Sequence, residues 1–264
     1  MNNLSIAIPT YNSSKYLEDI FKVLSRFKSI VEVIISDDLS DKKNLILLEK
    51  IVHEYKNKLN IKIYQNEKNL GGFKNKYMAT SLCSNDYIYQ LDSDNIPVLN
   101  SLNVISNFIN SNKFNKETLY LPSKLQTFNK NKISSLFKKK NYITFSDKNL
   151  ILDKKLILEN LNGEKDSIKD KSIRWVLNVG NPLFYKKAYL EKLEEGVFQN
   201  NINISAADAI ALNYYWIKNG GSIELLKNFK HLHRLRDDSY YVSEGAQSTE
   251  SINLYVENFK KLRS

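Results

Sequence analysis

The first half of the chain alternates short apolar runs with stretches of helical periodicity. Residues 4–8 form a short, mostly apolar run, which is typical of a buried strand. The apolar residues that follow recur every three or four positions and predict a helix, which Ser13 or Ser14 can cap at its start. These residues are Leu17, Ile20, Phe21, Leu24 and Phe27. A strand followed by a helix is therefore expected here.

The same unit recurs further along the chain. Apolar runs at 31–35 and 61–64 predict a second and a third strand, and a helical pattern follows each of them. The third helix is expected over about 73–82, and a fourth strand over 87–91. This alternation predicts an α/β fold with a Rossmann-like, mostly parallel sheet and helices on both faces.

The second half of the chain is less regular. The pattern is weak between 111 and 175, where the charged stretches 138–140 and 164–171 are expected to be solvated loops. Regular patterns return at 176–185, at about 205–219 with Gly220 and Gly221 at its end, and at 250–262. We expect one compact body whose two halves meet near residue 115.

The composition describes a globular protein, because 42% of the 264 residues are hydrophobic and only four are proline. Residues 1–8 lack the features of a secretory signal, and no apolar run approaches the ~20 residues that span a bilayer, so a cytoplasmic protein is expected. Cys83 is the only cysteine, which excludes an internal disulfide and a cysteine-based zinc site. Its expected role is a small buried side chain.

The net charge of +10 would suit nucleic acid, anionic lipid headgroups or phosphorylated substrates. Charge alone does not choose among them, and the Asn and Lys content can also reflect genome composition. The basic surface permits peripheral association with the inner face of the cell membrane.

Polar residues gather where the predicted strands end. In a parallel sheet the carboxyl ends of the strands share one edge, and ligands bind outside it. The residues expected at this edge are Thr10, Asp37, Asp38, Asn66 and Asp92. The sequence therefore predicts a ligand site there.

Asp92 and Asp94 flank Ser93 directly after the fourth predicted strand. Both carboxylates can reach one point in the loop and hold a divalent cation such as Mg²⁺, which is often bound by one or two carboxylates together with substrate phosphates. The alternative is an ordinary turn, because Asp and Ser are common turn residues.

Seven stretches of the chain resemble, in order and spacing, the motifs of a family 2 glycosyltransferase. In the first half these are IPTYN (8–12), VIISDDLSD (33–41), NEKNLGGFKN (66–75) and YIYQLDSD (87–94). Later in the chain they are VGNPLFYKKAYLEKL (179–193), AADAIALNYYWIKNGG (206–221) and HLHR (231–234). The likeness spans nearly the whole chain, with a gap over about 111–175.

This resemblance implies a GT-A fold and a sugar donor activated by a nucleotide diphosphate, with UDP favoured. It also implies Mg²⁺ or Mn²⁺ at Asp92 and Asp94, usually with inversion at the anomeric carbon. The acceptor would be a glycan, a lipid-linked molecule or a protein in bacterial surface glycan synthesis (capsule, lipopolysaccharide or glycoprotein), and no nucleic acid partner is expected. Residues 1–115 would form the nucleotide-sugar-binding half, 116–225 the acceptor-binding half and 226–264 a C-terminal helical segment.

The resemblance also assigns residues to the nucleotide. The end of the first strand would contact the nucleoside, with the Tyr11 ring against the base, although an ordinary buried aromatic is an equal reading of Tyr11. Asp38 would accept a hydrogen bond from the base. Asp41, by contrast, is expected to cap a helix or to form a turn. The full nucleotide-binding set is Pro9, Thr10, Tyr11, Asp38, Asn66, Lys74, Asn75, Asp92 and Ser93.

Asp208 is the candidate general base that would deprotonate the acceptor hydroxyl. It resembles the second acid of the family's Glu-Asp pair, whose first position is Ala207 here. The alternative is structural, because Ser205 and Asp208 have a spacing close to that of a capping box. The two roles can coexist.

Further residues would act on the leaving group and the acceptor. His233 could complete the metal shell or touch phosphate, and Arg234 could pair with phosphate. The resemblance places Asn178, Gly180 and Asn181 in the sugar and acceptor pocket. Trp175 and Trp216 could stack on a sugar ring, although core packing is the favoured reading of Trp216.

Two alternative functions stand beside this one. The first is a catalytically silent basic protein that uses a nucleotide-binding scaffold to bind nucleic acid or anionic membrane, which Lys138–Lys140 favours. The second is a nucleotidylyltransferase. The loop PTYNSSKY after the first strand argues against this second function, because it lacks the expected glycines.

Overall fold

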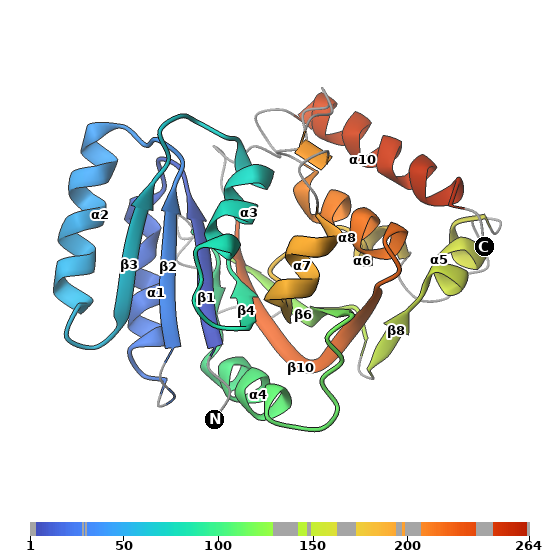
Figure 1. Ribbon diagram of the computed structural model, residues 1–264, viewed down its shortest axis with the longest axis horizontal. Coiled ribbons are helices and arrows are strands. Elements are labelled where there is room, and N and C mark those ends of the chain that lie inside the picture. The colour runs from blue at the N-terminus through green and yellow to red at the C-terminus, as the bar shows by residue number, and fades with distance from the viewer. Residues whose placement is uncertain are drawn as a thin grey trace.

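The computed structural model describes residues 4–27, 29, 31–128, 142–146, 149–162, 173–193, 197–198, 207–235 and 245–262. Within them, one ten-stranded sheet has the strand order β3-β2-β1-β4-β9-β6-β10-β5, with β7 added to β6 and β8 added to β10 (Figure 1). The charged stretches 138–140 and 164–171 and the possible cap Ser205 lie outside the described residues.

The first half of the sheet has the expected strands, all parallel. They are β1 (Leu4–Thr10), β2 (Val31–Asp37), β3 (Asn60–Gln65) and β4 (Tyr87–Gln90). β1 lies between β2 and β4, and β3 pairs with the outer side of β2. The carboxyl ends of these strands therefore meet at one edge, as the alternating sequence pattern predicts.

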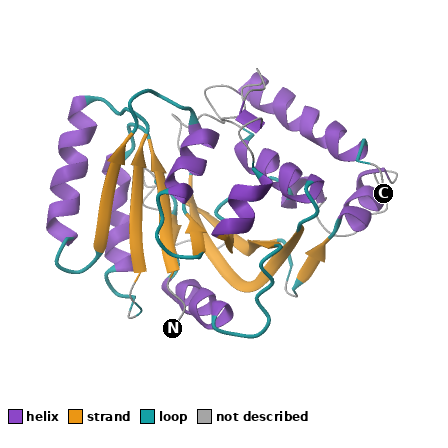
Figure 2. Cartoon of the chain, in the orientation of Figure 1, coloured by secondary structure: helices purple, strands orange, loops and turns teal. Residues whose placement is uncertain are grey.

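Helices connect these strands and cover both faces of the sheet (Figure 2). They are η1 (Ser14–Tyr16), α1 (Leu17–Leu24), α2 (Lys42–Tyr55) and α3 (Gly72–Ser81). Asp41 caps α2, because its side chain accepts a hydrogen bond from the backbone N–H of Asn44 at 2.8 Å. Of the two roles expected for Asp41, a cap or a turn, the structure shows the cap.

The second half of the chain completes the sheet and adds helices. Its described elements are β5 (Ile96–Pro97), α4 (Leu99–Ile109), β6 (Thr118–Phe128), β7 (Tyr142–Thr144), β8 (Leu150–Leu152), α5 (Lys154–Asn162), α6 (Ile173–Val176), β9 (Leu183–Tyr185), α7 (Lys186–Lys192), α8 (Asp208–Lys218), β10 (Ser222–Arg234) and α10 (Gly245–Lys260).

β6 corrects the expectation of an irregular segment over 111–175. This eleven-residue strand lies inside the sheet, between β9 and β10. Its first six residues are all buried, so it does not show the alternation of apolar and polar residues that marks a half-exposed strand. The expected boundary at residues 225–226 falls within β10.

β10 is a long, curved strand that reaches the carboxyl edge of the first half (Figure 1). Its register against β6 shifts between Leu226 and Lys230, where Asn228 has a φ of 65°. Beyond this bulge, β10 pairs with the short strand β5 through His231 and Leu232. The curve therefore brings the end of β10 next to the loop that follows β4.

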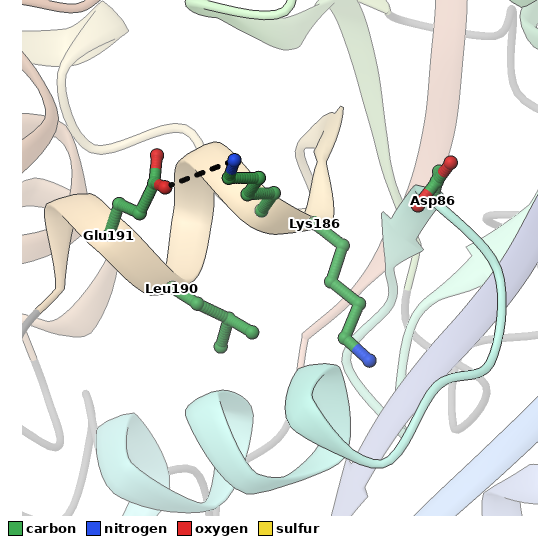
Figure 3. Close-up of a pocket in the computed structure, with 5 residues that line it drawn as sticks. Asp86, Lys186, Leu190 and Glu191 are labelled. Atoms are coloured by element: carbon green, nitrogen blue, oxygen red, sulfur yellow. Dashed lines mark ion pairs between the residues drawn. The ribbon is translucent and has the colours of Figure 1, made fainter.

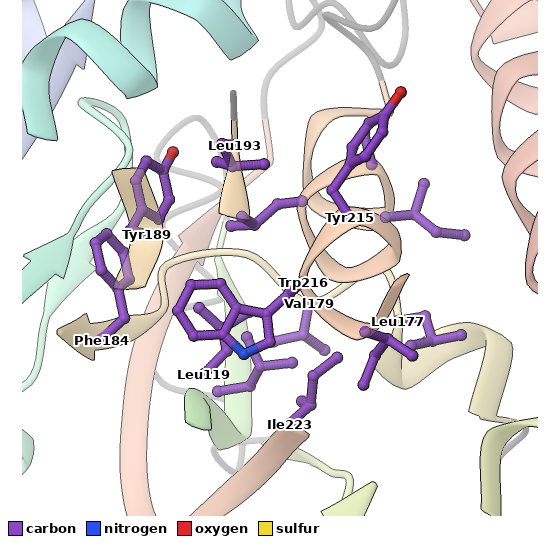
Figure 4. Close-up of a cluster of buried hydrophobic side chains, with 14 of the residues drawn as sticks. Leu119, Leu177, Val179, Phe184, Tyr189, Leu193, Tyr215, Trp216 and Ile223 are labelled. Carbon is purple, nitrogen blue, oxygen red and sulfur yellow. The ribbon is translucent and has the colours of Figure 1, made fainter. Parts of the chain in front are cut away.

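Two hydrophobic cores lie on opposite faces of the sheet. Ile6 and Ile8 pack with α1, α2 and α4 on one face, whereas Ala7 packs with α3, α7 and α8 on the other. Trp216 lies at the centre of the second core (Figure 4), and its Nε1 donates to the carbonyl of Glu117 at 3.1 Å. Trp216 is therefore a core residue, and Cys83 is buried as expected.

In the part of the chain that the structure describes, the helices are too short or too polar to cross a bilayer.

Candidate active site

A chain of hydroxyl groups lies beneath the carboxyl ends of β1 and β4. Thr10 Oγ1 is 2.8 Å from Ser13 Oγ, which is 2.7 Å from Ser93 Oγ, and all three side chains are buried. Pro9, one position before Thr10, is buried within β1 opposite Ser36. These hydroxyls join the loop after β1 to the loop after β4.

The two acids at the end of β2 are both buried and hydrogen-bonded. Asp37 accepts from the backbone N–H and the hydroxyl of Ser40, at 2.9 and 2.5 Å. Asp38 accepts from the N–H of Leu70 through Oδ1 at 2.8 Å and from the N–H of Gly71 through Oδ2 at 2.9 Å. Asp38 therefore holds the loop between β3 and α3, and its expected contact with a base stays a prediction.

Two asparagines extend this network. Asn66 Nδ2 donates to Asp38 Oδ1 at 2.9 Å and to Asn75 Oδ1 at 3.0 Å. Asn75 is buried in α3; its Nδ2 donates to the carbonyl of Ser36 at 3.0 Å and its Oδ1 accepts from the Ser36 hydroxyl at 2.7 Å. The Asn75 amide is thus occupied in tying α3 to β2.

Other side chains at this edge are more accessible. Tyr11 is 41% exposed in the loop after β1, and Leu39, which has a φ of 64°, is 46% exposed in the loop after β2. Lys74 is half-buried, with its Nζ 5.8 Å from the centroid of the Phe198 ring. Tyr11 and Lys74 therefore offer surface that a ligand could reach.

Lys76 joins two acids that lie far apart in the sequence. Its Nζ is 2.7 Å from Asp92 Oδ1 and 2.7 Å from Asp208 Oδ2. Asp92 follows β4, Asp208 is the first residue of α8, and Lys76 lies on the buried side of α3. The Lys76 side chain is 11% exposed, against 28% for Asp92 and 20% for Asp208, so the acids lie nearer the solvent.

This ion triad shifts the pKa of all three groups. Burial lowers the pKa of Lys76, but Asp208 and Asp92 outweigh it and hold that pKa above its usual value. Burial raises the pKa of Asp92, but Lys76 outweighs it and lowers that pKa overall. For Asp208, burial is the larger effect and keeps its pKa raised despite Lys76. Such shifts are typical of functional acids and bases.

The turn between α6 and β9 contacts the backbone of Asp92, whereas Lys76 contacts its side chain. Asn181 Oδ1 accepts from the backbone N–H of Asp92 at 2.7 Å, and Asn181 Nδ2 lies 3.4 Å from His231 Nε2. A Cβ added to Gly180 would lie 3.7 Å from Asp92 Oδ2, so a larger side chain there would cover that oxygen. Burial lowers the pKa of His231 to about 3, which leaves it neutral.

Arg234 is buried and supports the loop that carries Asp94. Its Nε donates to the carbonyl of Asp94 at 3.0 Å, and its Nη2 is 2.8 Å from Asp19 Oδ2 in α1. The guanidinium lies 4.7 Å from the centroids of both the Tyr16 and the Phe128 rings. With 3% of its side chain exposed, Arg234 faces protein groups here, and its expected contact with phosphate stays a prediction.

The remaining expected residues lie around this centre. His233 is partly exposed, with its ring centroid 6.2 Å from that of His231. Asn178 donates from Nδ2 to the carbonyl of Arg174 at 2.8 Å. Trp175 is 65% exposed on α6, which leaves its indole accessible. The buried Asn213 of α8 donates to the carbonyl of Leu177 at 2.8 Å and so ties the turn before β9 to the helix of Asp208.

Lys76 was missed at the sequence level, although a signal for it exists. It is three positions after Phe73 and three before Ala79, so the helical period places it on the apolar face of α3. A lysine on a buried helix face needs a charged partner, and two acids at the sheet edge supply it. Asn95 was also missed; its Nδ2 donates to Asp92 Oδ2 at 3.3 Å.

The sequence of this chain matches a known protein family. The family model described as "Glycosyl transferase family 2" matches residues 5–157, more than half of the chain. This protein belongs to glycosyl transferase family 2. The match covers β1 to β4 and the loop of Asp92 and Asp94, so it includes the edge described above.

This family 2 protein is similar in sequence to two glycosyltransferases of bacteria. The poly(ribitol-phosphate) beta-N-acetylglucosaminyltransferase TarS of Staphylococcus aureus is 36% identical over 98 residues, which are 36% of this chain and 16% of TarS. The abequosyltransferase RfbV of Salmonella typhimurium is 29% identical over 113 residues, 41% of this chain and 33% of RfbV. The matched segments are thus a third or less of each relative's length.

Solved structures establish the fold of the family 2 protein. S. aureus TarS 1–349 in complex with UDP-GlcNAc has a TM-score of 0.63 at 20% identity, covering 98% of this chain and 67% of that one. GalNAc-T7 with UDP, GalNAc and Mn²⁺ has a TM-score of 0.62 at 13% identity, covering 98% of this chain and 50% of that one. These likenesses confirm the expected GT-A type of α/β fold.

Two acids of the family 2 protein carry the type of oxygen donor that a divalent ion shared with a ligand would use. Within the described ranges, no three His, Cys, Asp or Glu side chains group closely enough to hold a metal by themselves. Mg²⁺ commonly needs only one or two carboxylates when phosphates complete its shell. Asp92 and Asp94 carry hard oxygen donors of this kind; Asp92 Oδ2 accepts a long bond of 3.3 Å from Asn95, and Gly180 places no side chain against it.

A separate hollow of about 340 Å³ lies away from this edge (Figure 3). It is lined by Asp86, Lys186, Lys187, Leu190 and Glu191, and Lys187 and Glu191 pair across one helical turn at 3.7 Å. Asp86 directly precedes β4, so the hollow lies at the amino end of that strand, opposite the end that carries Asp92. It is a different place from the candidate active site.

Proposed function

We propose that this protein is a glycosyltransferase that moves one sugar from a nucleotide-diphosphate donor to an acceptor hydroxyl. UDP is the favoured nucleotide, because two of the similar TarS structures are complexes, one with UDP and one with UDP-GlcNAc. The names of TarS and RfbV describe transfer of N-acetylglucosamine to poly(ribitol-phosphate) and transfer of abequose. They support a role in bacterial surface glycan synthesis, with a glycan, lipid-linked molecule or protein as acceptor.

One observation carries this proposal: Asp92 and Asp208 meet on Lys76 at the carboxyl edge of the sheet. The edge is where ligands bind in open α/β folds. An acid from the loop after β4 and an acid from the start of α8 are thereby held within reach of one ligand. Transfer uses two such groups, since one must face the diphosphate and the other the acceptor hydroxyl.

In the proposed reaction, the acceptor oxygen forms a bond to the anomeric carbon as the bond from that carbon to the diphosphate oxygen breaks. Asp208 takes the proton of the acceptor hydroxyl, and the electron pair of the broken bond leaves with the nucleoside diphosphate. A single direct displacement inverts the anomeric configuration. The raised pKa of Asp208 strengthens it as a base in its ionised form.

Asp92 and Asp94, with His233 nearby, are the residues proposed to hold Mg²⁺ or Mn²⁺. The bound ion would offset charge on the departing diphosphate. The Mn²⁺ in the structure of GalNAc-T7, which shares this fold, supports the assignment. Asn181 and Arg234 would hold the loop of these acids through Asp92 N–H and the carbonyl of Asp94.

The nucleoside would lie over the loops after β1 and β2. Tyr11 and Lys74 have accessible surface for the base and the phosphates. Asp38 and Asn75 would act by shaping the loop between β3 and α3, because their polar atoms already bond to protein groups. The exposed Trp175 would face the acceptor side, next to Asn178.

The proposal is tested with a panel of UDP-, GDP- and CDP-sugars, each added to the purified protein with and without Mn²⁺. The measured quantity is the rise in unfolding temperature, because a ligand that binds only the folded state stabilises it. We expect UDP-sugars to stabilise the protein when Mn²⁺ is present and the Asp94→Asn variant to respond weakly. No response to any nucleotide sugar would contradict the proposal.

A further inference from the structure

Lys76 lies beneath the two acids to which the proposed function assigns separate roles. Its ammonium contacts both at 2.7 Å and is the least exposed member of the triad. The turn of α3 that carries it is held in place, because Gln90 Nε2 lies 3.3 Å from the Lys76 carbonyl, the Thr80 hydroxyl and the Tyr189 hydroxyl. Protein contacts therefore fix the segment that carries the lysine, while the two acids remain more accessible to a ligand from the solvent.

We propose that Lys76 is a positioning residue that serves as the resident cation of this site. Without donor, it holds Asp92 and Asp208 together. With a nucleotide sugar and its divalent ion bound, Asp92 would be the group that holds the ion, while Lys76 would stay on Asp208 and orient it toward the acceptor. This inference rests on the proposed function, in which Asp92 is a metal ligand and Asp208 is the base.

The geometry makes the two cations competitors. Asp92 Oδ1 already bonds to Lys76, and a divalent ion on the same carboxylate would lie close to the ammonium. Like charges about 4 Å apart repel strongly outside bulk water. A divalent ion should therefore bind weakly to Asp92 when no donor is present. The negative charge of the donor's phosphates would offset the repulsion from Lys76 and strengthen binding of the ion. Lys76 in this way couples metal binding to donor binding.

Another buried lysine shows what a purely structural ion pair looks like in this chain. Lys192 Nζ is 2.7 Å from Glu117 Oε2 and donates to the carbonyl of Asn219 at 3.0 Å, with 10% of its side chain exposed. Its burial matches that of Lys76, but among the described residues its ion pair is with one carboxylate, that of Glu117. It joins α7 to the end of α8, away from the candidate active site. Lys192 therefore provides a matched control.

The decisive experiment measures Mn²⁺ affinity without any nucleotide, by the electron paramagnetic resonance signal of unbound Mn²⁺. Lys76→Met removes the ammonium and leaves two acids close together, so we expect Mn²⁺ to bind about tenfold tighter, or more, than to the wild type. Lys76→Arg keeps the charge and should stay near the wild-type affinity. Lys192→Met should also leave the affinity unchanged.

Lys76→Gln is the second neutral variant. It is needed if Lys76→Met does not fold because Asp92 and Asp208 have lost their hydrogen-bond donor. Its amide can still donate to a carboxylate but carries no charge, so the same gain in Mn²⁺ affinity is expected. A folded neutral variant that binds Mn²⁺ no tighter than the wild type overturns the proposal.

Kinetics supply a second readout. Because Lys76 orients Asp208, Lys76→Met should lower kcat for sugar transfer without raising the KM for the donor, and Lys76→Arg should restore part of kcat. A wild-type kcat in a neutral variant also overturns the proposal. If the wild type transfers sugar from no donor, the proposed function fails, whereas the Mn²⁺ comparison uses no donor and still decides the role of Lys76.

Discussion

The side-chain oxygen of Asn181 accepts a hydrogen bond from the backbone N–H of Asp92 at 2.7 Å. The two residues belong to different segments of the sheet, since Asp92 follows β4 and Asn181 lies in the turn before β9. Asn181 has a φ of 59°, a conformation that most side chains disfavour. Asn181 therefore has two roles: its backbone sets the shape of the turn, and its side chain fixes the position of Asp92.

Replacing Asn181 with glycine should keep the turn and remove this support. Glycine accepts a positive φ, so the fold is expected to survive. Loss of the hydrogen bond should weaken Mn²⁺-dependent donor binding or transfer by about 10- to 100-fold, as is typical for residues that orient a metal ligand. Steady-state kinetics at several Mn²⁺ concentrations measure this effect. Wild-type kinetics in a folded Asn181→Gly variant would show that the contact does not position Asp92.

Asp38→Ala tests whether Asp38 acts through the loop that it holds. Its carboxylate accepts from the N–H groups of Leu70 and Gly71, and leaving these donors unpaired should cost about 1–3 kcal/mol in the free energy of unfolding. Urea unfolding measures the loss. Asp41→Ala is the matched control, because it removes an exposed acid from the same segment and loses only the hydrogen bond that caps α2.

The two variants should also differ in donor binding. Asp38→Ala is expected to raise the KM for the donor, whereas Asp41→Ala should leave it unchanged. An Asp38→Ala variant with wild-type stability would contradict the proposal that Asp38 holds the loop between β3 and α3.

Asp208→Asn separates catalysis from a role in helix α8. The substitution keeps the shape of the side chain but removes its capacity to take a proton. We expect kcat to fall by about 10²- to 10⁴-fold with little change in donor affinity. If Asp208 served only to start α8, stability would drop by about 1 kcal/mol and kcat would stay near the wild-type value. Turnover and unfolding measured on the same preparation distinguish these results.

Much of the fold could be predicted from the sequence, because the first half is locally consistent. Apolar strands and amphipathic helices alternate there, and polar residues mark where each strand ends. β6 escaped prediction because its six buried leading residues owe their strand conformation to pairing with β9 and β10. Its place in the sheet is set by tertiary contacts, which the local pattern does not contain.

The candidate site was predictable in its location but not in its contacts. The carboxyl edge follows from the order of strands and helices. The Lys76 triad depends on where α8 and α3 meet, and the burial of Arg234 depends on the curve of β10 and on two aromatic rings. A motif names residue types, whereas these partners come from segments that only the folded chain brings together.

Glu32 should make stability depend on pH at the other end of the sheet. Burial raises its pKa, but hydrogen bonds from Ser5, Ser84 and Lys62 outweigh this and lower the pKa to about 2. A lowered pKa contributes stability that is fully present above the ordinary value near 4.5 and is lost as the pH falls through about 2.

Glu32→Gln should therefore be less stable than the wild type at pH 7, and the difference should shrink between pH 4.5 and pH 2. Urea unfolding of both proteins across this range measures it. A difference that stays constant down to pH 2 would show that ionised Glu32 is not the source of the stability.

The central claim is that a divalent ion and a nucleotide diphosphate meet at Asp92 and Asp94. The most direct measurement is the anomalous scattering of Mn²⁺ in crystals soaked with Mn²⁺ and UDP. We predict a Mn²⁺ peak within coordination distance of the Asp92 or Asp94 carboxylate and of the diphosphate oxygens, with the uracil near Tyr11. A nucleotide bound elsewhere, or a diphosphate at this edge with no Mn²⁺ beside either acid, would contradict the account.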